Sequence, residues 1–204
     1  MTQGRSNLKG EPYGASLLCL LVPDAVYHPL GPDAKHLSEN IAEHSHQVAV
    51  LAHSLALIRR DILGLEADPE RCATAALYHD ASEILTGDLP TPIKYYNPAI
   101  KAAYKQVERL SGEKLLAMLP PELRPSMEDY IFETDPVSHD IVKAADKLSA
   151  HIKCIEELKA GNLEFESAAA QTRRALQSMD LPELNWFMEH CLESFKLNLD
   201  ELQG

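Results

Sequence analysis

The chain has 204 residues, 45% of them hydrophobic, which supplies enough apolar material for one domain with a substantial core. Its 31 acidic residues outnumber 19 basic ones and give a net charge of −12. That charge opposes sequence-independent binding to a nucleic acid polymer or to an anionic membrane. A small anionic substrate would therefore need a local positive centre, such as a metal ion.

The four cysteines are scattered without the C-x-x-C spacing of redox and zinc motifs. A chain of this size has no need of disulfide staples, so a reducing cytoplasm is the expected location. The one targeting-like stretch, ASLLCLLV at 15–22, is short, runs directly into Pro23 and shows no clear cleavage site. No run approaches the roughly 20 apolar residues of a membrane span.

Residues 1–36 contain four prolines and four glycines with little periodicity, which predicts an irregular N-terminal segment. The rest, 37–204, has the periodicity of helices and is expected to form a single domain. Apolar residues at steps of three and four predict a helix over 38–62, and His44 begins its apolar stripe. Asp68 followed by Pro69 is a typical N-cap, and it opens a second helix that we expect to reach Gly87.

The second half of the chain continues the helical pattern after a loop over 87–97. No segment has the alternation of a strand, and there is no internal repeat, so the predicted fold class is all-α, a single helical bundle. We expect the remaining helices over 97–118, from the Pro120-Pro121 pair onward, and over 138–159, 163–178 and 182–199.

The second predicted helix places several reactive side chains on one face. His79 and Asp80 stand side by side in its middle, although neither is a good helix former, so local folding gives no reason for the pair. Burying an imidazole and carboxylates costs several kcal/mol if they are unpaired, and such groups therefore usually bind metals, pair with charges or transfer protons. The residues on this face, at steps of four, three, one, three and four, are Cys72, Ala76, His79, Asp80, Glu83 and Gly87.

Two residues elsewhere break the local pattern in the same way. His44 occupies the apolar stripe of the first long helix, and Asp146 lies in mid-helix among Val142, Ala145 and Ser149. Two histidines and two aspartates on three helices would form a mixed nitrogen and oxygen site, which suits Mn, Fe, Co, Ni or Zn better than Mg or Ca. Glu83 would remain for proton transfer to water.

Taken alone, each of these residues also has a purely structural interpretation. His44 is explained by a hydrogen bond inside the core, Asp146 by an ion pair with Lys143 or Lys147, and Glu83 by a solvated helix face. The other seven histidines receive the structural interpretation outright. It is the order H…HD…D, with an adjacent pair between two helical residues, that favours a metal site.

The same order is the signature of the HD superfamily of metal-dependent phosphohydrolases. From Leu37 to the C-terminus the chain closely resembles the bacterial 5′-deoxynucleotidases of the YfbR type, and the segment HDASEILTGDLPTPIKY is far more specific than a bare HD dipeptide. The other strings that carry the resemblance are ENIAEHSHQVA, VKAADKLSAHIKCIEELKAGN and the tail from WFME to LNLDE.

The resemblance implies an all-α HD domain, a homodimer, and removal of phosphate from deoxyribonucleoside 5′-monophosphates with one divalent transition metal. Carried over position by position, it makes Glu83 the carboxylate that handles protons. The implied metal ligands are His44, His79, Asp80 and Asp146, and the loop implied to line the nucleotide site is Asp88, Leu89, Pro90 and Thr91.

Upstream of about Leu37 the resemblance fades. Family members carry an Arg-Trp pair there, which orients the phosphate and packs near the sugar, whereas this chain has YHPLGPDAKHLSEN and its only tryptophan is Trp186. Two alternatives to a 5′-deoxynucleotidase therefore stay open. One is an HD phosphohydrolase or phosphodiesterase for another phosphorylated metabolite, and the other is a regulatory protein that binds metal or nucleotide without turnover.

Overall fold

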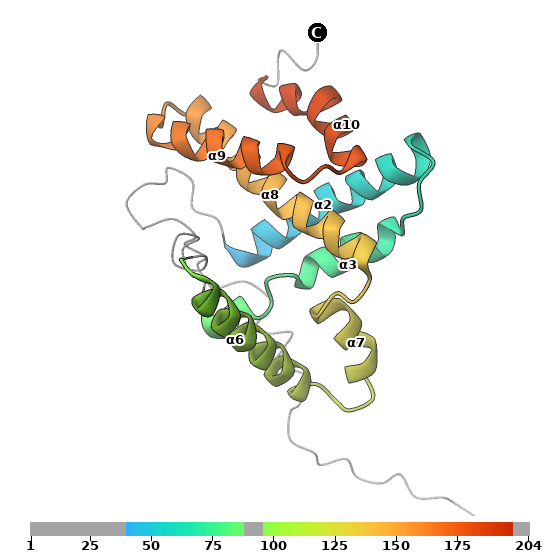
Figure 1. Cartoon of the computed structure of the whole chain (residues 1–204). Coiled ribbons are helices and arrows are strands. Elements are labelled where there is room, and N and C mark those ends of the chain that lie inside the picture. Colours follow the sequence, from blue (N-terminus) through green and yellow to red (C-terminus); the bar gives the residue numbers. More distant parts are fainter. Residues whose placement is uncertain (1–39, 88–95, 198–204) are drawn as a thin grey trace, which may run out of the picture.

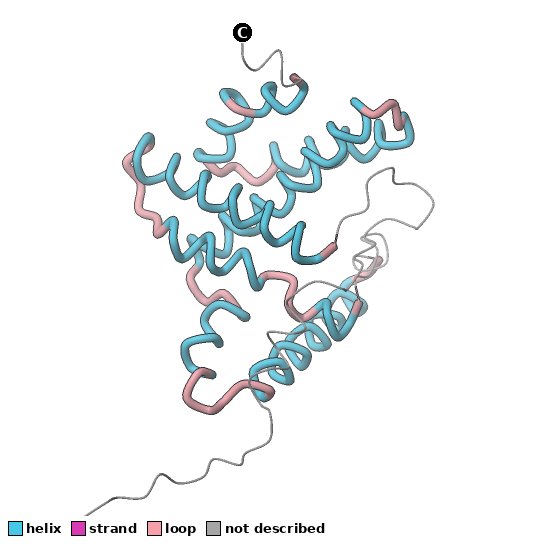
Figure 2. The backbone as a smooth tube through the Cα atoms, turned by 180° about the vertical axis from the view of Figure 1, so that it is seen from behind, coloured by secondary structure: helices cyan, strands magenta, loops and turns pink. Residues whose placement is uncertain are grey.

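The computed structural model describes residues 40–87 and 96–197, and every regular element in those ranges is a helix (Figures 1 and 2). This confirms the predicted all-α class. The α-helices are α2 (Ile41–Leu57), α3 (Pro69–Tyr78), α4 (Glu83–Thr86), α6 (Pro98–Ala117), α7 (Arg124–Ile131), α8 (Pro136–Lys159), α9 (Glu166–Gln177) and α10 (Pro182–His190). Short π or 3-10 turns are η1 (Ile58–Ile62), η2 (Leu163–Phe165) and η3 (Leu192–Lys196).

Polar caps fix where the principal helices begin. Asn40 caps α2 in a capping box, because its side chain accepts from Glu43 N at 2.9 Å while the Glu43 carboxylate accepts from Asn40 N at 3.1 Å. The caps of α3, α6 and α8 are each followed by proline at the first helical position, where its missing N–H costs nothing. These three caps are Asp68, Asn97 and Asp135.

The main core lies where α2 packs against α3 and α8 in the middle of the molecule (Figure 1). Leu55, Ala76 and Leu148, one from each helix, are all fully buried. Helix α9 packs on α8, and α10 packs beside η1 and η3. None of the helices within the described ranges is both long enough and apolar enough to cross a membrane.

Helices α6 and α7 have a small apolar cluster of their own, formed by Leu115, Leu116 and Leu119 with side chains of α7. Ala81, directly after the His79-Asp80 pair, is buried in this second cluster. The pair therefore lies on the short connection between the two clusters, with α3 in the main core on one side and α6 on the other.

The prediction of one helix from 69 to 87 was wrong. Helix α3 ends at Tyr78, residues 79–82 form turns, and α4 is a separate helix of four residues. The weak helix propensities of His79 and Asp80 agree with the end of α3 at Tyr78. Turn hydrogen bonds from Ala81 N to Tyr78 O at 3.0 Å and from Glu83 N to Asp80 O at 2.9 Å replace the helical ones. A single helical face cannot explain why these residues meet.

Other boundaries differ in smaller ways. The helix expected from Pro120-Pro121 begins at Arg124, after a turn closed from Leu123 N to Pro120 O at 3.0 Å. The helix expected over 182–199 ends at His190 and continues as η3, while 198 and 199 lie outside the described residues. The expected irregular segment 1–36 also lies outside them, so the division into 1–36 and 37–204 stays a prediction.

A buried ion pair fastens α10 to the end of the first long helix. Glu183, in the first turn of α10, is completely buried, and both of its oxygens accept from Arg59 Nη1 at 3.1 and 3.2 Å. Arg59 Nε donates to Glu66 O at 2.9 Å, which holds the guanidinium in place. A buried carboxylate without a partner would destabilise the fold, so Glu183 requires Arg59 when α10 packs in this position.

We expect Arg59→Met to lower the free energy of unfolding by about 3 kcal/mol, because it leaves the Glu183 carboxylate buried without its partner. The double variant Arg59→Met/Glu183→Met should recover most of that loss, since it removes both charges. Urea unfolding of the three proteins measures the effect. A loss of less than about 1 kcal/mol in the single variant, the usual value for an exposed pair, would contradict this interpretation.

Candidate metal centre and the cleft beside it

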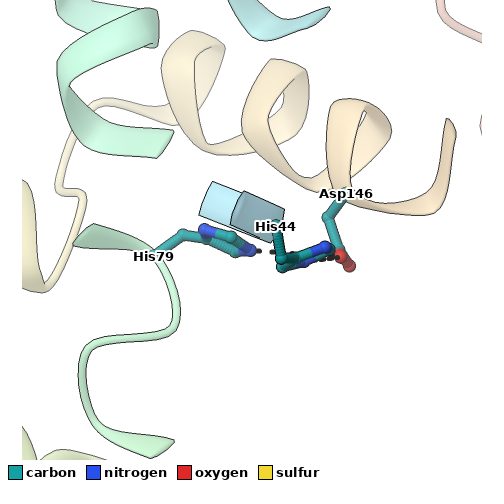
Figure 3. Close-up of side chains that lie close together, drawn as sticks. All are labelled: His44, His79 and Asp146. Carbon is teal, nitrogen blue, oxygen red and sulfur yellow. Dashed lines mark ion pairs between the residues drawn. The ribbon is translucent and has the colours of Figure 1, made fainter. Parts of the chain in front are cut away.

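Three helical segments bring two imidazoles and two carboxylates together. Ligand atoms of His44 from α2, His79 from the turn after α3, and Asp146 from α8 all lie within 4.8 Å of one another (Figure 3). His44 Nε2 is 3.3 Å from Asp146 Oδ1 and 3.5 Å from Asp80 Oδ2, and the two rings have centroids 5.4 Å apart. The four predicted metal ligands are therefore neighbours in space.

Local backbone contacts fix how His79 faces this cluster. Its Nδ1 lies 2.7 Å from Ala76 O, and because a carbonyl oxygen only accepts, Nδ1 carries the hydrogen. In the neutral imidazole the lone pair is then on Nε2, which is buried and lies 3.2 Å from Asp80 Oδ2. A histidine with one nitrogen anchored to a backbone carbonyl and the other directed at carboxylates has the usual orientation of a metal ligand.

The electrostatics of the cluster favour a positive charge. Burial by itself lowers the pKa of an imidazole, but the nearby Asp80 and Asp146 outweigh it and raise the pKa of His79 to about 9. Burial likewise opposes ionisation of Asp146, yet His44 and His79 hold its pKa below the ordinary value. The carboxylates that keep a proton on His79 would also attract a divalent cation, which would replace that proton when it binds.

The site is closed on one side and open on the other. The side chains of His44, His79 and Asp80 are 8%, 12% and 18% exposed, whereas that of Asp146 is 41% exposed. Beside it lies a cleft of about 870 Å³ between α8 and α6, to which His79, Asp80 and Asp146 contribute. A ligand would therefore approach from the Asp146 side. The donors are two imidazole nitrogens and carboxylate oxygens, a set that fits a divalent transition metal.

Glu83 is the predicted proton-handling residue, and the structure places it in the wall of the same cleft. It is the first residue of α4 and is largely buried, with 8% of its surface exposed. The turn at 79–82 sets its position, because Glu83 N is bound to Asp80 O. Glu83 therefore lies near His79 and Asp80 because of the turn, and not because of helical spacing.

Helices α6 and α7 form the far wall of the cleft, and the sequence did not predict it. Its charged residues stand on helices whose exposed faces look like any solvated surface, and no motif marks them. Cations and acids alternate there, so the wall is mixed in charge. The basic residues that line the cleft are Lys105, Arg109, Arg124 and Lys143, and the acidic ones on α6 and α7 are Glu108, Glu113 and Glu128.

Other sequence interpretations can also be placed. The structural interpretation of His151 is confirmed, since it is buried with Nδ1 2.9 Å from Thr172 Oγ1. Asp146 pairs with His44 at 3.3 Å, so the lysine partners considered for it are not needed to explain its position. The loop predicted to line the nucleotide site lies outside the described residues; it comprises Asp88, Leu89, Pro90 and Thr91.

The arrangement of helices is that of an HD-domain phosphohydrolase. An HD-domain phosphohydrolase from Listeria innocua superposes with a TM-score of 0.70 at 22% identity, covering 92% of this chain and 90% of that one. The cyanophage S-2L HD phosphohydrolase DatZ, solved with dA and one catalytic Zn²⁺ ion, gives a TM-score of 0.58 at 20% identity, covering 83% and 91%. Identities this low establish the fold alone.

Sequence comparison narrows the class to one family. Residues 30–195 match the family described as 5′-deoxynucleotidase YfbR-like. A 5′-deoxynucleotidase of Photobacterium profundum is 48% identical over 170 residues, covering 81% of this chain and 86% of the relative. One of Erwinia tasmaniensis is 48% identical over 167 residues, covering 81% and 84%. The chain belongs to the YfbR-like 5′-deoxynucleotidase family.

We expect His79→Ala and Asp80→Ala each to abolish stoichiometric binding of a divalent transition metal, because each removes a donor from a cluster of four. The matched control is His46→Ala on α2, since His46 is exposed and two residues from His44. Metal content after dialysis decides the outcome. One equivalent of metal retained in both cluster variants would overturn the ligand assignment.

Proposed function

We propose that this chain is a 5′-deoxynucleotidase that hydrolyses deoxyribonucleoside 5′-monophosphates to a deoxynucleoside and phosphate. The single observation that carries the proposal is the meeting of His44, His79, Asp80 and Asp146 at the cleft of a YfbR-like chain. The relatives named above are 5′-deoxynucleotidases, and they align with most of this chain. The cleft wall is mixed in charge, and its four lysine and arginine side chains are available as partners for the phosphate.

We further propose that those four side chains hold one divalent transition metal, among Co, Mn, Fe, Ni and Zn. When bound, such an ion neutralises phosphate charge and makes water a better nucleophile near neutral pH. The mixed donor set of imidazole nitrogens and carboxylate oxygens supports a transition metal over Mg or Ca. Asp80 and Asp146 would supply the negative charge that holds the ion, and the contact of His79 Nδ1 with Ala76 O leaves Nε2 as the nitrogen that would bind it.

Glu83 is assigned proton transfer. Its carboxylate stands in the cleft wall close to His79 and Asp80 in the chain, and the turn that separates α3 from α4 holds it there. A carboxylate beside the attacking water removes a proton as the oxygen approaches phosphorus, and the same group returns a proton to the departing sugar oxygen. No cysteine or serine nucleophile is required, because water attacks directly.

Glu83→Gln should retain the metal and lower kcat by a factor of about 10² to 10⁴, the usual range for a general acid or base. The amide keeps the size of the side chain but cannot accept the proton. The measurement is phosphate release from dAMP, with metal content determined on the same samples. Loss of the metal in this variant would show that Glu83 is a ligand and that its role has been misassigned.

The chain lacks the Arg-Trp pair that the resemblance leads one to expect before residue 37, and the corresponding stretch 23–36 lies outside the described residues. Loss of one charge-assisted phosphate contact lowers kcat/KM by about tenfold to hundredfold if nothing replaces it. Loss of an apolar wall near the sugar weakens the exclusion of a 2′-hydroxyl. The metal cluster does not depend on either contact, so hydrolysis should survive.

We therefore expect kcat/KM to discriminate between dAMP and AMP, and between dUMP and UMP, less strongly than in a relative that has the pair. The assay uses saturating Co²⁺ for both proteins. Discrimination of about a thousandfold or more would mean that residues 23–36 rebuild the wall. Hydrolysis of another phosphorylated metabolite in preference to all nucleotides, or binding without turnover, would instead favour one of the two alternatives left open by the sequence.

Location and assembly complete the proposal. We propose a cytoplasmic enzyme, as expected for a chain in which Cys72, Cys154 and Cys191 are all free thiols. We also propose a homodimer, which the resemblance to the YfbR type implies. The molar mass in solution distinguishes a dimer from a monomer of 22.6 kDa.

A further inference from the structure

Helices α3 and α8 lie side by side and run in the same direction. Cys72 Sγ is 3.5 Å from Ser138 Oγ near the start of both helices, and both residues are buried. Seven residues after Cys72 comes His79, and eight residues after Ser138 comes Asp146. Those two side chains are again neighbours, with His79 Nε2 4.0 Å from Asp146 Oδ1. The distance between these two cluster members therefore depends on the axial register of the two helices.

An ion pair joins the first turn of α3 to the turn that precedes α8, near the start of both helices. Arg71 Nη2, on α3, is 3.0 Å from Glu133 Oε1, in the turn between α7 and α8. Both side chains are largely shielded, at 24% and 11% exposed. The same Glu133 oxygen accepts from Asp135 N at 3.0 Å, and Asp135 is the cap at which α8 begins. Arg71 is therefore connected through one carboxylate to the first turn of α8.

The backbone at Glu133 is held in an uncommon conformation. Its φ is +32°, in the left-handed region that residues with a side chain rarely adopt. Such conformations persist where the surroundings impose them, and here the carboxylate is fixed from both sides. The Arg71 guanidinium is itself positioned by the Tyr130 ring, whose centroid is 5.7 Å from Cζ. Glycine and asparagine adopt a positive φ at lower cost than glutamate does.

We propose that the Arg71–Glu133 ion pair sets the axial register of α3 on α8 and thereby positions His79 and Asp80 against Asp146. Both are positioning residues, because neither belongs to the cluster of imidazoles and carboxylates. A slip of one residue along a helix moves a side chain by about 1.5 Å and turns it by about 100°, which is enough to separate ligands of one ion. The inference rests on the proposed metal site.

The test compares Co²⁺ affinity with thermal stability in the full chain. Wild type, Arg71→Met, Glu133→Gln and Arg59→Met are titrated with Co²⁺ by calorimetry, and Tm is measured for each metal-free protein. Arg59→Met is the matched control, because it breaks an ion pair of similar burial that fastens α10 and includes no residue of α3 or α8. We expect all three variants to lower Tm, but only those of the Arg71–Glu133 pair to weaken Co²⁺ affinity, by about tenfold.

Arg71→Lys keeps the charge and serves where the methionine variant folds poorly; its affinity should lie between those of wild type and Arg71→Met. Three results would overturn the inference. One is equal Co²⁺ affinity in wild type and both variants of the pair, and another is the same loss of affinity in Arg59→Met. The third is a raised KM for dAMP in Glu133→Gln at unchanged Co²⁺ affinity, since Glu133 would then contact the nucleotide. A wild-type protein that binds no Co²⁺ would instead refute the metal site itself.

Discussion

The structure depends on the attraction between imidazoles and carboxylates where α2, α3 and α8 meet. His44, His79, Asp80 and Asp146 come from three separate segments, and the side chains of all but Asp146 are at most 18% exposed. Like charges on the two aspartates repel at this range unless a cation lies between them. The apolar core brings the helices together, but it would do so equally well with leucine at these positions. Polar residues at these positions fit the proposed metal site.

Much of the fold and of the cluster could be predicted from the sequence, and the helix prediction that was wrong failed for a local reason. Capping residues such as Asp68 and Asn97 gave helix starts because they act within one turn, and the order H…HD…D identified the cluster. The break after Tyr78 was not foreseen, because hydrophobic spacing at 72–87 fits a helix and propensity differences of a fraction of a kcal/mol are easily overruled. The Arg71–Glu133 pair, 62 residues apart, carries no sequence signal at all.

The cleft shows how an acidic chain can receive an anion. The net charge of −12 describes the field at a distance, where it repels polyanions such as nucleic acids. Within a Debye length of about 8 Å, individual groups dominate, and Lys105, Arg109, Arg124 and Lys143 all line the cleft. A small phosphate ester that has entered the cleft meets these four cations within a wall of mixed charge, while a long polyanion is held off by the rest of the surface.

The turn that interrupts the helical path between Tyr78 and Glu83 also limits how this protein can be improved. Replacing residues of the turn with strong helix formers such as alanine or leucine would favour one continuous helix, and a screen for thermostability would reward it. A continuous helix would replace the turn hydrogen bond from Glu83 N to Asp80 O and would change the position of Glu83 relative to the cluster. Substitutions at these four positions would therefore alter the proposed site, and stabilising changes are better sought on the outer faces of α9 and α10.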